Sequence, residues 1–399
     1  MVKPVTTMTH DTNIPQGYKA TALGIIPQEW EVRPLNYLGA ICSGGTPDTE
    51  VAEYWNGDIA WCTPSDITKL DTKYIESTEV KITAKGLKES SATLLPPRSI
   101  VVCTRATIGN AAICNTEIAT NQGFKNIIPN EKTNPEWLYY IIIYSKPRLV
   151  RFGCGSTFLE VSKKDFSRFK IAVPPLAEQR KIAEVLSVWD EAIEKQARLI
   201  EKLALRKRAL MQRLLSAKLR LPGFSEPWKK VKLGDVAELY QPQTIQSEDL
   251  SQTGYPVYGA NGLIGYYNNY NHEYPQVVIT CRGSSCGTVN FTPGKCWITG
   301  NAMVLNVDNN RDVNKSFFYY LISNSSFVNL ISGSGQPQIV RQPLLKFELR
   351  IPPLKEQTAI AEVLTAADRE IDLAKEKLER LRRQKRGLMQ QLLTGKKRI

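Results

Sequence analysis

The feature that most constrains this chain is an internal repeat of its own sequence. The segment P-P-L-A-E-Q at residues 174–179 returns as P-P-L-K-E-Q at residues 352–357, 178 positions further on. At that offset about half of the next forty residues are identical. Identity over so long a stretch indicates a duplication. Because the likeness is weaker upstream, we expect one shared frame that carries two different domains.

Each repeated segment has the spacing of a coiled-coil helix. From Ile182 to Leu214, and again from Ile360 to Leu392, the heptad positions follow alternating steps of four and three and are mostly apolar. A surface helix packed on a globular core is the alternative, but unbroken heptads in two copies favour a coiled coil. Two heptad positions, Lys207 and Lys385, are charged. Their side chains either reach past the edge of the seam into solvent or fix the register of the helices.

The charges of the two helices favour antiparallel pairing. The net charges are −2 over residues 176–196, +7 over 197–220, −3 over 354–374 and +8 over 375–399. Parallel helices would place the two basic halves together, whereas antiparallel helices place each basic half beside an acidic one. We therefore expect Ile182 to lie near Leu392, and Leu214 near Ile360.

Composition narrows the class of protein. The 399 residues, 42% of them hydrophobic, fit two or three domains with real cores. The net charge of +13 favours an acidic partner such as nucleic acid or an anionic membrane. No apolar run approaches the roughly 18 residues of a membrane span, and the N-terminus lacks a signal pattern. Eight cysteines without a C-x-x-C pair, and only two histidines, predict a cytoplasmic protein without a zinc site.

The regions before the helices are predicted to be mixed α/β domains, so that the whole chain is of the α+β class. They contain short β-rich runs, many glycine-containing loops, and a buried helix over residues 137–144, after Asn134-Pro135-Glu136. The loops are either ordinary turns, or places where backbone and Asn, Gln and Arg side chains meet phosphates and bases. The expected division is a domain over 1–172, a helix over 173–221, a domain over 222–350 and a helix over 351–399.

Together these motifs resemble the specificity (S) subunit of Type I restriction–modification systems. The likeness rests on the repeated P-P-L-x-E-Q helices and on the segments 44–47, 64–66, 153–158 and 255–262. It covers all but the first fifteen or so residues. It implies two target-recognition domains that read the halves of a split double-stranded DNA site, with conserved spacer helices between them. It also implies binding of two methyltransferase (M) subunits, which use S-adenosylmethionine for DNA methylation, and of two ATP-dependent restriction (R) subunits. The specificity subunit itself would be non-catalytic and would need no cofactor.

The same resemblance implies which residues are in the DNA-reading loops. They include Gly45, Thr46, Arg105, Asn121 and Gln122 in the first domain, and Tyr258, Asn261, Arg282, Gln336 and Gln338 in the second. Residues 155–158 read G-S-T-F where residues 335–338 read G-Q-P-Q. We therefore expect the two domains to read different half-sites.

Enzyme motifs are scarce in the sequence. It has no G-x-x-x-x-G-K-S/T loop of an ATP-driven motor, and its V-P-P-L and I-P-P-L segments lack the polar and aromatic residues of an adenine methyltransferase loop. Asp48, Glu79 and Lys81 leave one alternative, a self-sufficient Mg²⁺-dependent DNA nuclease. A coiled-coil adaptor without DNA contact is a third reading. We expect a DNA-binding scaffold that directs partner enzymes.

Overall fold

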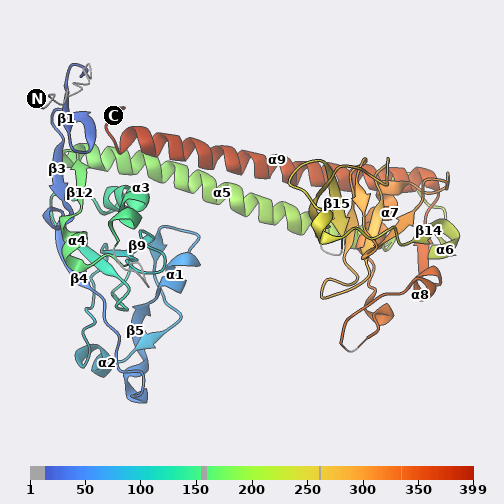
Figure 1. Ribbon diagram of the computed structural model, residues 1–399, viewed down its shortest axis with the longest axis horizontal. Helices are drawn as coiled ribbons and strands as arrows, with labels where there is room; N and C mark the ends of the chain where they lie inside the picture. Colours follow the sequence, from blue (N-terminus) through green and yellow to red (C-terminus); the bar gives the residue numbers. More distant parts are fainter. Residues whose placement is uncertain (1–13, 154–159, 260–261, 334) are drawn as a thin grey trace, which may run out of the picture. The chain divides into compact units, whose positions relative to one another are not determined.

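The computed structural model describes residues 14–153, 160–259, 262–333 and 335–399, and the chain divides into two compact units. Unit 1 comprises Met1–Ala197 with Glu376–Ile399, and unit 2 comprises Arg198–Lys375. The boundaries fall inside two helices of 39 residues, α5 (Leu176–Leu214) and α9 (Leu354–Leu392). Each unit therefore contains one half of both helices (Figure 1).

Unit 1 is a mixed α/β domain. Its described strands form a five-stranded sheet, β4 (Gly39–Ser43), β11 (Lys125–Pro129), β8 (Ile100–Val102), β9 (Ala111–Cys114) and β6 (Tyr74–Ile75), in that spatial order. A three-stranded sheet contains β10 (Ile118–Thr120), β5 (Trp55–Cys62) and β7 (Lys81–Ile82), and two pairs are β12 (Lys170–Val173) with β3 (Glu31–Pro34) and β1 (Tyr18–Thr21) with β2 (Gly24–Pro27). Its own helices are α1 (Pro64–Thr68), α2 (Ala84–Lys88), α3 (Pro135–Phe152) and α4 (Lys163–Arg168).

The interior of unit 1 has an apolar layer on each face of the five-stranded sheet. Successive side chains of a strand point to opposite faces, so Ile100 and Val102 join the cluster that includes α3, whereas Val101 joins the cluster on the other face. The predicted buried helix is confirmed: the Asn134 side chain accepts a hydrogen bond from the Trp137 backbone N–H (2.8 Å), and Trp137 is fully buried.

Unit 2 repeats this plan. A four-stranded sheet has the order β14 (Glu238–Tyr240), β20 (Ala302–Asn306), β17 (Val277–Thr280) and β18 (Val289–Phe291). A second sheet contains β16 (Gly262–Tyr267), β15 (Tyr255–Gly259) and β19 (Trp297–Ile298), and β13 (Lys229–Lys232) pairs with β21 (Glu348–Ile351). The helices of unit 2 are α6 (Leu233–Val236), α7 (Lys315–Ser323) and α8 (Arg341–Leu345).

The order β4-β11-β8-β9 matches β14-β20-β17-β18, and the parallel pair β10–β5 matches β19–β15. The sequence repeat is therefore a repeat of two mixed α/β domains, as predicted.

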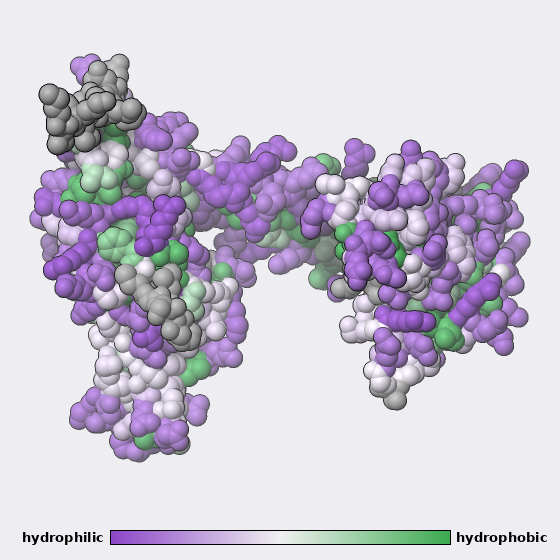
Figure 2. All heavy atoms as spheres, viewed as in Figure 1, coloured by the Kyte–Doolittle hydropathy of each residue, from purple (hydrophilic) through white to green (hydrophobic). Residues whose placement is uncertain are grey.

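The long helices bury their apolar side within each unit. In unit 1, Ile182 of α5 and Leu392 of α9 belong to one buried cluster; in unit 2, Leu214 of α5 and Ile360 of α9 belong to another. The visible outer face of both helices is mostly hydrophilic (Figure 2). These clusters contain the residue pairs expected of antiparallel helices.

The cysteines among the described residues are free thiols, and five of these cysteines are buried. Burial raises the pKa of Cys103 to about 11 and of Cys114 to about 12, which makes them unreactive core residues. Among the described residues, no helix is long and apolar enough to cross a membrane.

Candidate nucleic-acid interface

The loop between β8 and β9 presents Arg105 on the surface of unit 1. The loop is closed by two backbone hydrogen bonds, from Gly109 N–H to Cys103 O (2.9 Å) and from Cys103 N–H to Asn110 O (2.8 Å). Gly109 has a positive φ of 84°, a conformation that a side chain would strain. Arg105 is exposed at the start of this loop, where its guanidinium can meet a ligand.

Unit 2 presents Arg282 from a loop of the same design. Gly287, with a φ of 89°, donates its N–H to Thr280 O (2.9 Å), and Thr280 N–H donates to Thr288 O (2.8 Å). Arg282 is exposed two residues after Thr280, just as Arg105 is exposed two residues after Cys103 in the equivalent loop. The two arginines are therefore structural equivalents.

A second loop of unit 1, after β10, lies against the Arg105 loop. Thr104 donates its backbone N–H to Gly123 O (2.8 Å), and the Asn121 side chain accepts from Gly123 N–H (2.9 Å) to close a local turn. This places exposed Gln122 beside the backbone of Arg105. In unit 2 the matching bond runs from Cys281 N–H to Asn301 O (3.0 Å).

Thr46 and Gly45 join this site from the end of β4. Gly45 N–H donates to Thr120 O (2.9 Å), and the Thr46 hydroxyl donates to the side-chain oxygen of Gln122. Gly45 is buried, and its carbonyl accepts from the Trp61 indole N–H (2.9 Å). Gly45 thus positions Thr46 and is not itself accessible to a ligand. The five residues predicted in the first domain lie on three adjoining loops.

Two residues that sequence reasoning missed complete the site in unit 1. Glu160 accepts from Arg105 Nε (2.8 Å) and lies 3.5 Å from the ammonium of Lys125. Lys125 is buried, and its pKa is lowered by burial and raised in part by Glu160. The Glu160 segment is held to the Arg105 loop because Val161 N–H donates to Thr104 O (3.0 Å).

Four of the five residues predicted in the second domain lie among the described residues. Gln338 forms a bridge with Arg282, Gly283 N–H donates to Pro337 O (3.1 Å), and Gln336 is exposed in the same segment. Tyr258 lies in β15, where burial raises its pKa. Its carbonyl accepts from Thr299 N–H (2.9 Å), two residues before Asn301 meets the Arg282 loop. Asn261 and residues 154–159, which include the G-S-T-F segment, lie outside the described residues.

The repeated P-P-L-x-E-Q motif has an internal role. In unit 1 the Gln179 side chain accepts from Asn134 N–H (2.9 Å) and donates to the carbonyls of Lys132 (3.2 Å) and Pro174 (3.0 Å). Gln357 makes the same three kinds of bond in unit 2. Each glutamine therefore ties the loop before α3 or α7 to the start of a long helix.

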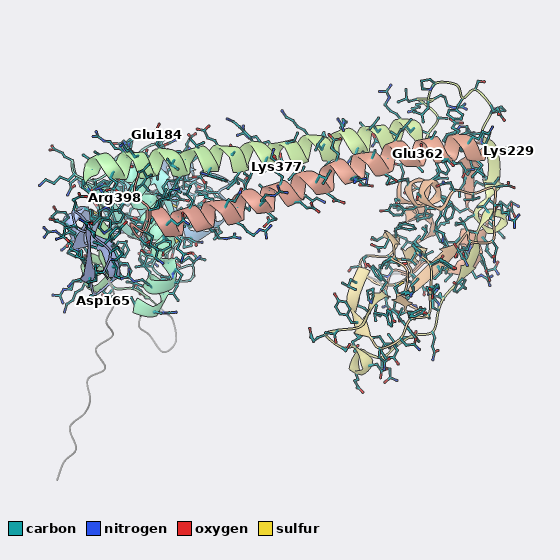
Figure 3. All side chains as sticks on the ribbon, turned by 90° about the horizontal axis from the view of Figure 1, so that it is seen from above. Asp165, Glu184, Lys229, Glu362, Lys377 and Arg398 are labelled. Atoms are coloured by element: carbon teal, nitrogen blue, oxygen red, sulfur yellow. The ribbon has the colours of Figure 1, made fainter. Side chains whose placement is uncertain are left out.

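The glutamate of the motif is buried beside an arginine that follows the end of the other helix. Glu178 accepts from the Trp30 indole (2.9 Å) and from Arg398 Nε (2.7 Å), which lies near the start of α5 (Figure 3). Glu356 and Arg220 repeat the arginine contact in unit 2 (2.6 Å). A carboxylate in the first turn also suits the positive helix N-terminus.

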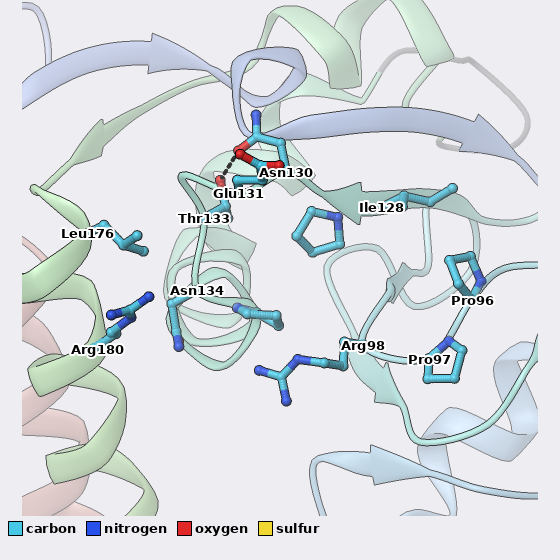
Figure 4. Close-up of a pocket in the computed structure, with 12 residues that line it drawn as sticks. Pro96, Pro97, Arg98, Ile128, Asn130, Glu131, Thr133, Asn134, Leu176 and Arg180 are labelled. Carbon is cyan, nitrogen blue, oxygen red and sulfur yellow. Dashed lines mark hydrogen bonds between the residues drawn. The ribbon is translucent and has the colours of Figure 1, made fainter.

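A surface pocket of about 500 Å³ opens beside the first motif. Pro96, Arg98, Asn130, Leu176 and Arg180 are among its lining residues (Figure 4). Glu178 and Gln179 themselves are buried, so only their exposed neighbours in this motif can meet another molecule.

The residues of the nuclease alternative are engaged separately. Glu79 pairs with Lys69 (2.7 Å), and Asp48 accepts from the backbone of Glu50 (2.9 Å). Within the described ranges, no group of three His, Cys, Asp or Glu residues could hold a metal ion.

Comparison with known families decides the class of the protein. Residues 27–204 and 225–383 match the family described as the Type I restriction modification DNA specificity domain. The chain belongs to this family.

Curated relatives of this specificity-domain protein are named specificity subunits. The MjaIX specificity subunit of Methanocaldococcus jannaschii is 40% identical over 193 residues, which are 47% of this chain and 45% of that relative. The EcoprrI specificity subunit of Escherichia coli is 26% identical over 361 residues, 85% of this chain and 88% of that relative. The chain thus spans under half of the first relative and most of the second.

Solved structures share the fold. The S subunit from M. genitalium matches with a TM-score of 0.57 and 17% identity, over 91% of this chain and 96% of that one. A chain from a study of complex assembly and conformational transition of the type I R-M system matches with a TM-score of 0.62 and 20% identity, over 93% and 99%. The resemblance that the sequence indicated is confirmed by the family match and by the relatives named specificity subunits.

Proposed function

We propose that this specificity subunit reads a bipartite double-stranded DNA site, one half with each unit, and directs methyltransferase and restriction subunits to it. The observation that carries the proposal is the pair of equivalent loop sets. The same backbone bonds hold Arg105 in unit 1 and Arg282 in unit 2, whereas the side chains around them differ. Arginine, glutamine and asparagine are the side chains that read base edges in the major groove. Two readers of one design with different side chains suit two different half-sites.

The loops act as the DNA-reading surface of target-recognition domains over residues 1–172 and 222–350. Segments 173–221 and 351–399 are the conserved spacer helices. The net charge of +13 suits a polyanionic partner, and the free, buried cysteines suit a cytoplasmic location.

The methyltransferase subunits dock on the long helices and on the exposed part of segments 174–179 and 352–357. Two copies of this surface suit two methyltransferase subunits, which supply S-adenosylmethionine chemistry that this chain does not perform. The pocket beside Leu176 and Arg180 adjoins the first of these surfaces. The restriction subunits join the same assembly.

The spacer helices form an antiparallel coiled coil with internal pseudo-twofold symmetry. Reciprocal ion pairs support this arrangement: Lys385 pairs with Asp190 in unit 1, and Lys207 pairs with Asp368 in unit 2. Each lysine and each aspartate is 178 positions from its counterpart, which is the pattern of a self-complementary interface. The lysine side chains are only 16% and 20% exposed, so they act as register pins and do not extend into solvent.

Methylation mapping tests the proposed function. The chain is expressed with its methyltransferase subunit, and the methylated sequence is compared with that of a chimera whose residues 228–348 come from a relative. Only one half of the split site should change. A chimera that alters both halves contradicts the modular reading.

The purified chain alone distinguishes the nuclease alternative. With Mg²⁺ it should bind DNA in a salt-dependent manner and leave it intact. Mg²⁺-dependent cleavage that is lost in Asp48→Ala would support the nuclease, and an absence of salt-dependent DNA affinity would support a purely structural adaptor.

A further inference from the structure

We propose that Glu160 is a specificity-determining residue that holds Arg105 as a guanine-reading fork in the first half-site. The inference rests on the proposed function, because it assigns a role within the same DNA-reading loops.

The contact of Glu160 with Arg105 leaves one edge of the guanidinium available. Glu160 Oε2 accepts from Arg105 Nε at 2.8 Å, and within the described part of the chain no other hydrogen bond of the Arg105 side chain is found. The two terminal nitrogens point away from Nε and form a planar pair of donors. Two parallel donors match O6 and N7 of guanine in the major groove, the commonest specific contact of arginine. The Arg105 side chain as a whole is 44% exposed, so it can meet a ligand.

Lys125 fixes the other side of the same carboxylate. Glu160 Oε1 lies 3.5 Å from Lys125 Nζ, on the opposite oxygen from the one that Arg105 uses. The Lys125 side chain is 7% exposed, and a buried ammonium needs a counter-ion. One carboxylate oxygen of Glu160 is therefore held by the buried Lys125, and the other oxygen holds the exposed Arg105. This restricts the rotamers of Arg105 before DNA arrives, which lowers the entropy cost of binding.

Unit 2 lacks both members of this charged pair. Lys125 follows Gly123 by two residues, and Met303 follows Asn301 by two residues at the equivalent backbone bond. Glu160 precedes Val161, and Gln338 precedes Ile339, where the next pair of equivalent bonds lies. The lysine and the glutamate are thus replaced together by the uncharged Met303 and Gln338, which indicates that they work as one unit. At the position equivalent to Glu160, Arg282 therefore has the uncharged Gln338 in place of a carboxylate.

The test uses the full chain assembled with its methyltransferase subunits. Three variants are compared with the wild type: Glu160→Gln, the double variant Glu160→Gln/Lys125→Met, and Gln338→Ala as the matched control in unit 2. The double variant reproduces the uncharged pair of unit 2, so it removes the support without leaving a buried ammonium unpaired. Affinities are measured on duplexes in which each base pair of the first half-site is changed in turn, and methylated sites are mapped in cells.

In the double variant, discrimination against replacement of one G·C pair in the first half-site should fall about tenfold or more, while the second half-site is read as before. Gln338→Ala should leave the first half-site unchanged. A folded double variant that keeps full discrimination at every position of the first half-site overturns the proposal. Equal loss of affinity for all sequences also overturns it, because that result indicates a structural role alone.

Arg105→Ala and Arg282→Ala separate this proposal from the function on which it rests. If both arginine variants retain the wild-type site and affinity, the proposed reading loops are wrong. If the arginine variants change the site but the Glu160 variants do not, the loops stand and only the role of Glu160 is refuted.

Discussion

Lys385 of α9 pairs with Asp190 of α5, and its ammonium also lies 5.1 Å from the ring centre of Tyr140. Tyr140 donates its hydroxyl to Asp190. Burial, and then the charge of Asp190, raise the pKa of Tyr140, so the phenol stays a donor. Lys73 is a second cation, 3.6 Å from the same carboxylate. Lys385, the charged residue at a heptad position of α9, is therefore neutralised by Asp190 within unit 1.

Unit 2 repeats this cluster with one cation fewer among its described residues. Lys207 pairs with Asp368, and Tyr320 donates to Asp368 (2.7 Å). Lys207→Met should therefore lower the free energy of unfolding by about 1–2 kcal/mol. Lys385→Met should lower it less, because Asp190 keeps Lys73. Denaturant unfolding of both variants measures the difference, and equal losses would contradict this account of the seam.

Gln179→Ala should destabilise unit 1 by about 1–3 kcal/mol, because it leaves the part-buried Asn134 N–H and the carbonyls of Lys132 and Pro174 without their partner. Denaturant unfolding gives the loss, and faster hydrogen exchange at Asn134 N–H would locate it. Ala177→Ser, two positions away on an exposed site, is the control and should be neutral. A neutral Gln179→Ala would show that the motif glutamine serves something other than this connection.

The stability of unit 2 should fall at acidic pH because of His272. Burial lowers the pKa of His272 below its usual 6.5, against a smaller opposite effect of Asp308. Below pH 6.5 the His272 side chain binds a proton more readily in the unfolded chain than in the folded one, so its contribution to stability is constant above that pH and decreases below it. The decrease levels off below the folded-state pKa. The denaturation midpoint between pH 7.5 and 5.5 measures this.

His272→Gln provides the comparison for that measurement. Its side chain can still meet the Tyr240 hydroxyl, which lies 2.9 Å from His272 Nε2, but it cannot be protonated in this range. The variant should lose the acid-sensitive part of the stability curve. A curve that keeps the same slope would assign the effect to other groups.

Local sequence patterns predicted the parts of the fold whose causes are local. The heptads gave both long helices, and Asn134-Pro135-Glu136 gave the start of α3 with its side-chain cap. The repeat predicted two domains of one design, because duplicated residues meet duplicated surroundings. The partner of Lys385 was also present in the repeat, since Asp190 and Asp368 are among its identical positions, but only the helix register pairs them.

The candidate site was predictable only in part. Arg105, Gln122 and Thr46 were selected from a family resemblance, and the structure brings their loops together. Glu160 could not be selected, because it is 55 positions from Arg105 and lies next to it only through the packing of a separate segment. Gly45 was predicted to lie in a DNA-reading loop, and the close approach of the Ser91 and Ala92 backbone explains why this loop position is a buried glycine.

The unit boundaries in α5 and α9 lead to a prediction on the spacing of the DNA site. They fall after Ala197 and after Lys375, so a heptad inserted at each boundary leaves the internal contacts of both units intact. One heptad lengthens a helix by about 10 Å and keeps the seam in phase. At about 3.4 Å per base pair this is on the order of three base pairs. The variant with both insertions should methylate a site with the same two half-sites and an unread gap longer by about that number.

Two control variants test whether the seam must stay matched. A heptad in α5 alone should weaken DNA binding, because its seam no longer matches α9. Two extra residues in each helix should destabilise the protein. Unchanged gap length in the double-heptad variant, mapped by methylation, would refute the helices as the spacer.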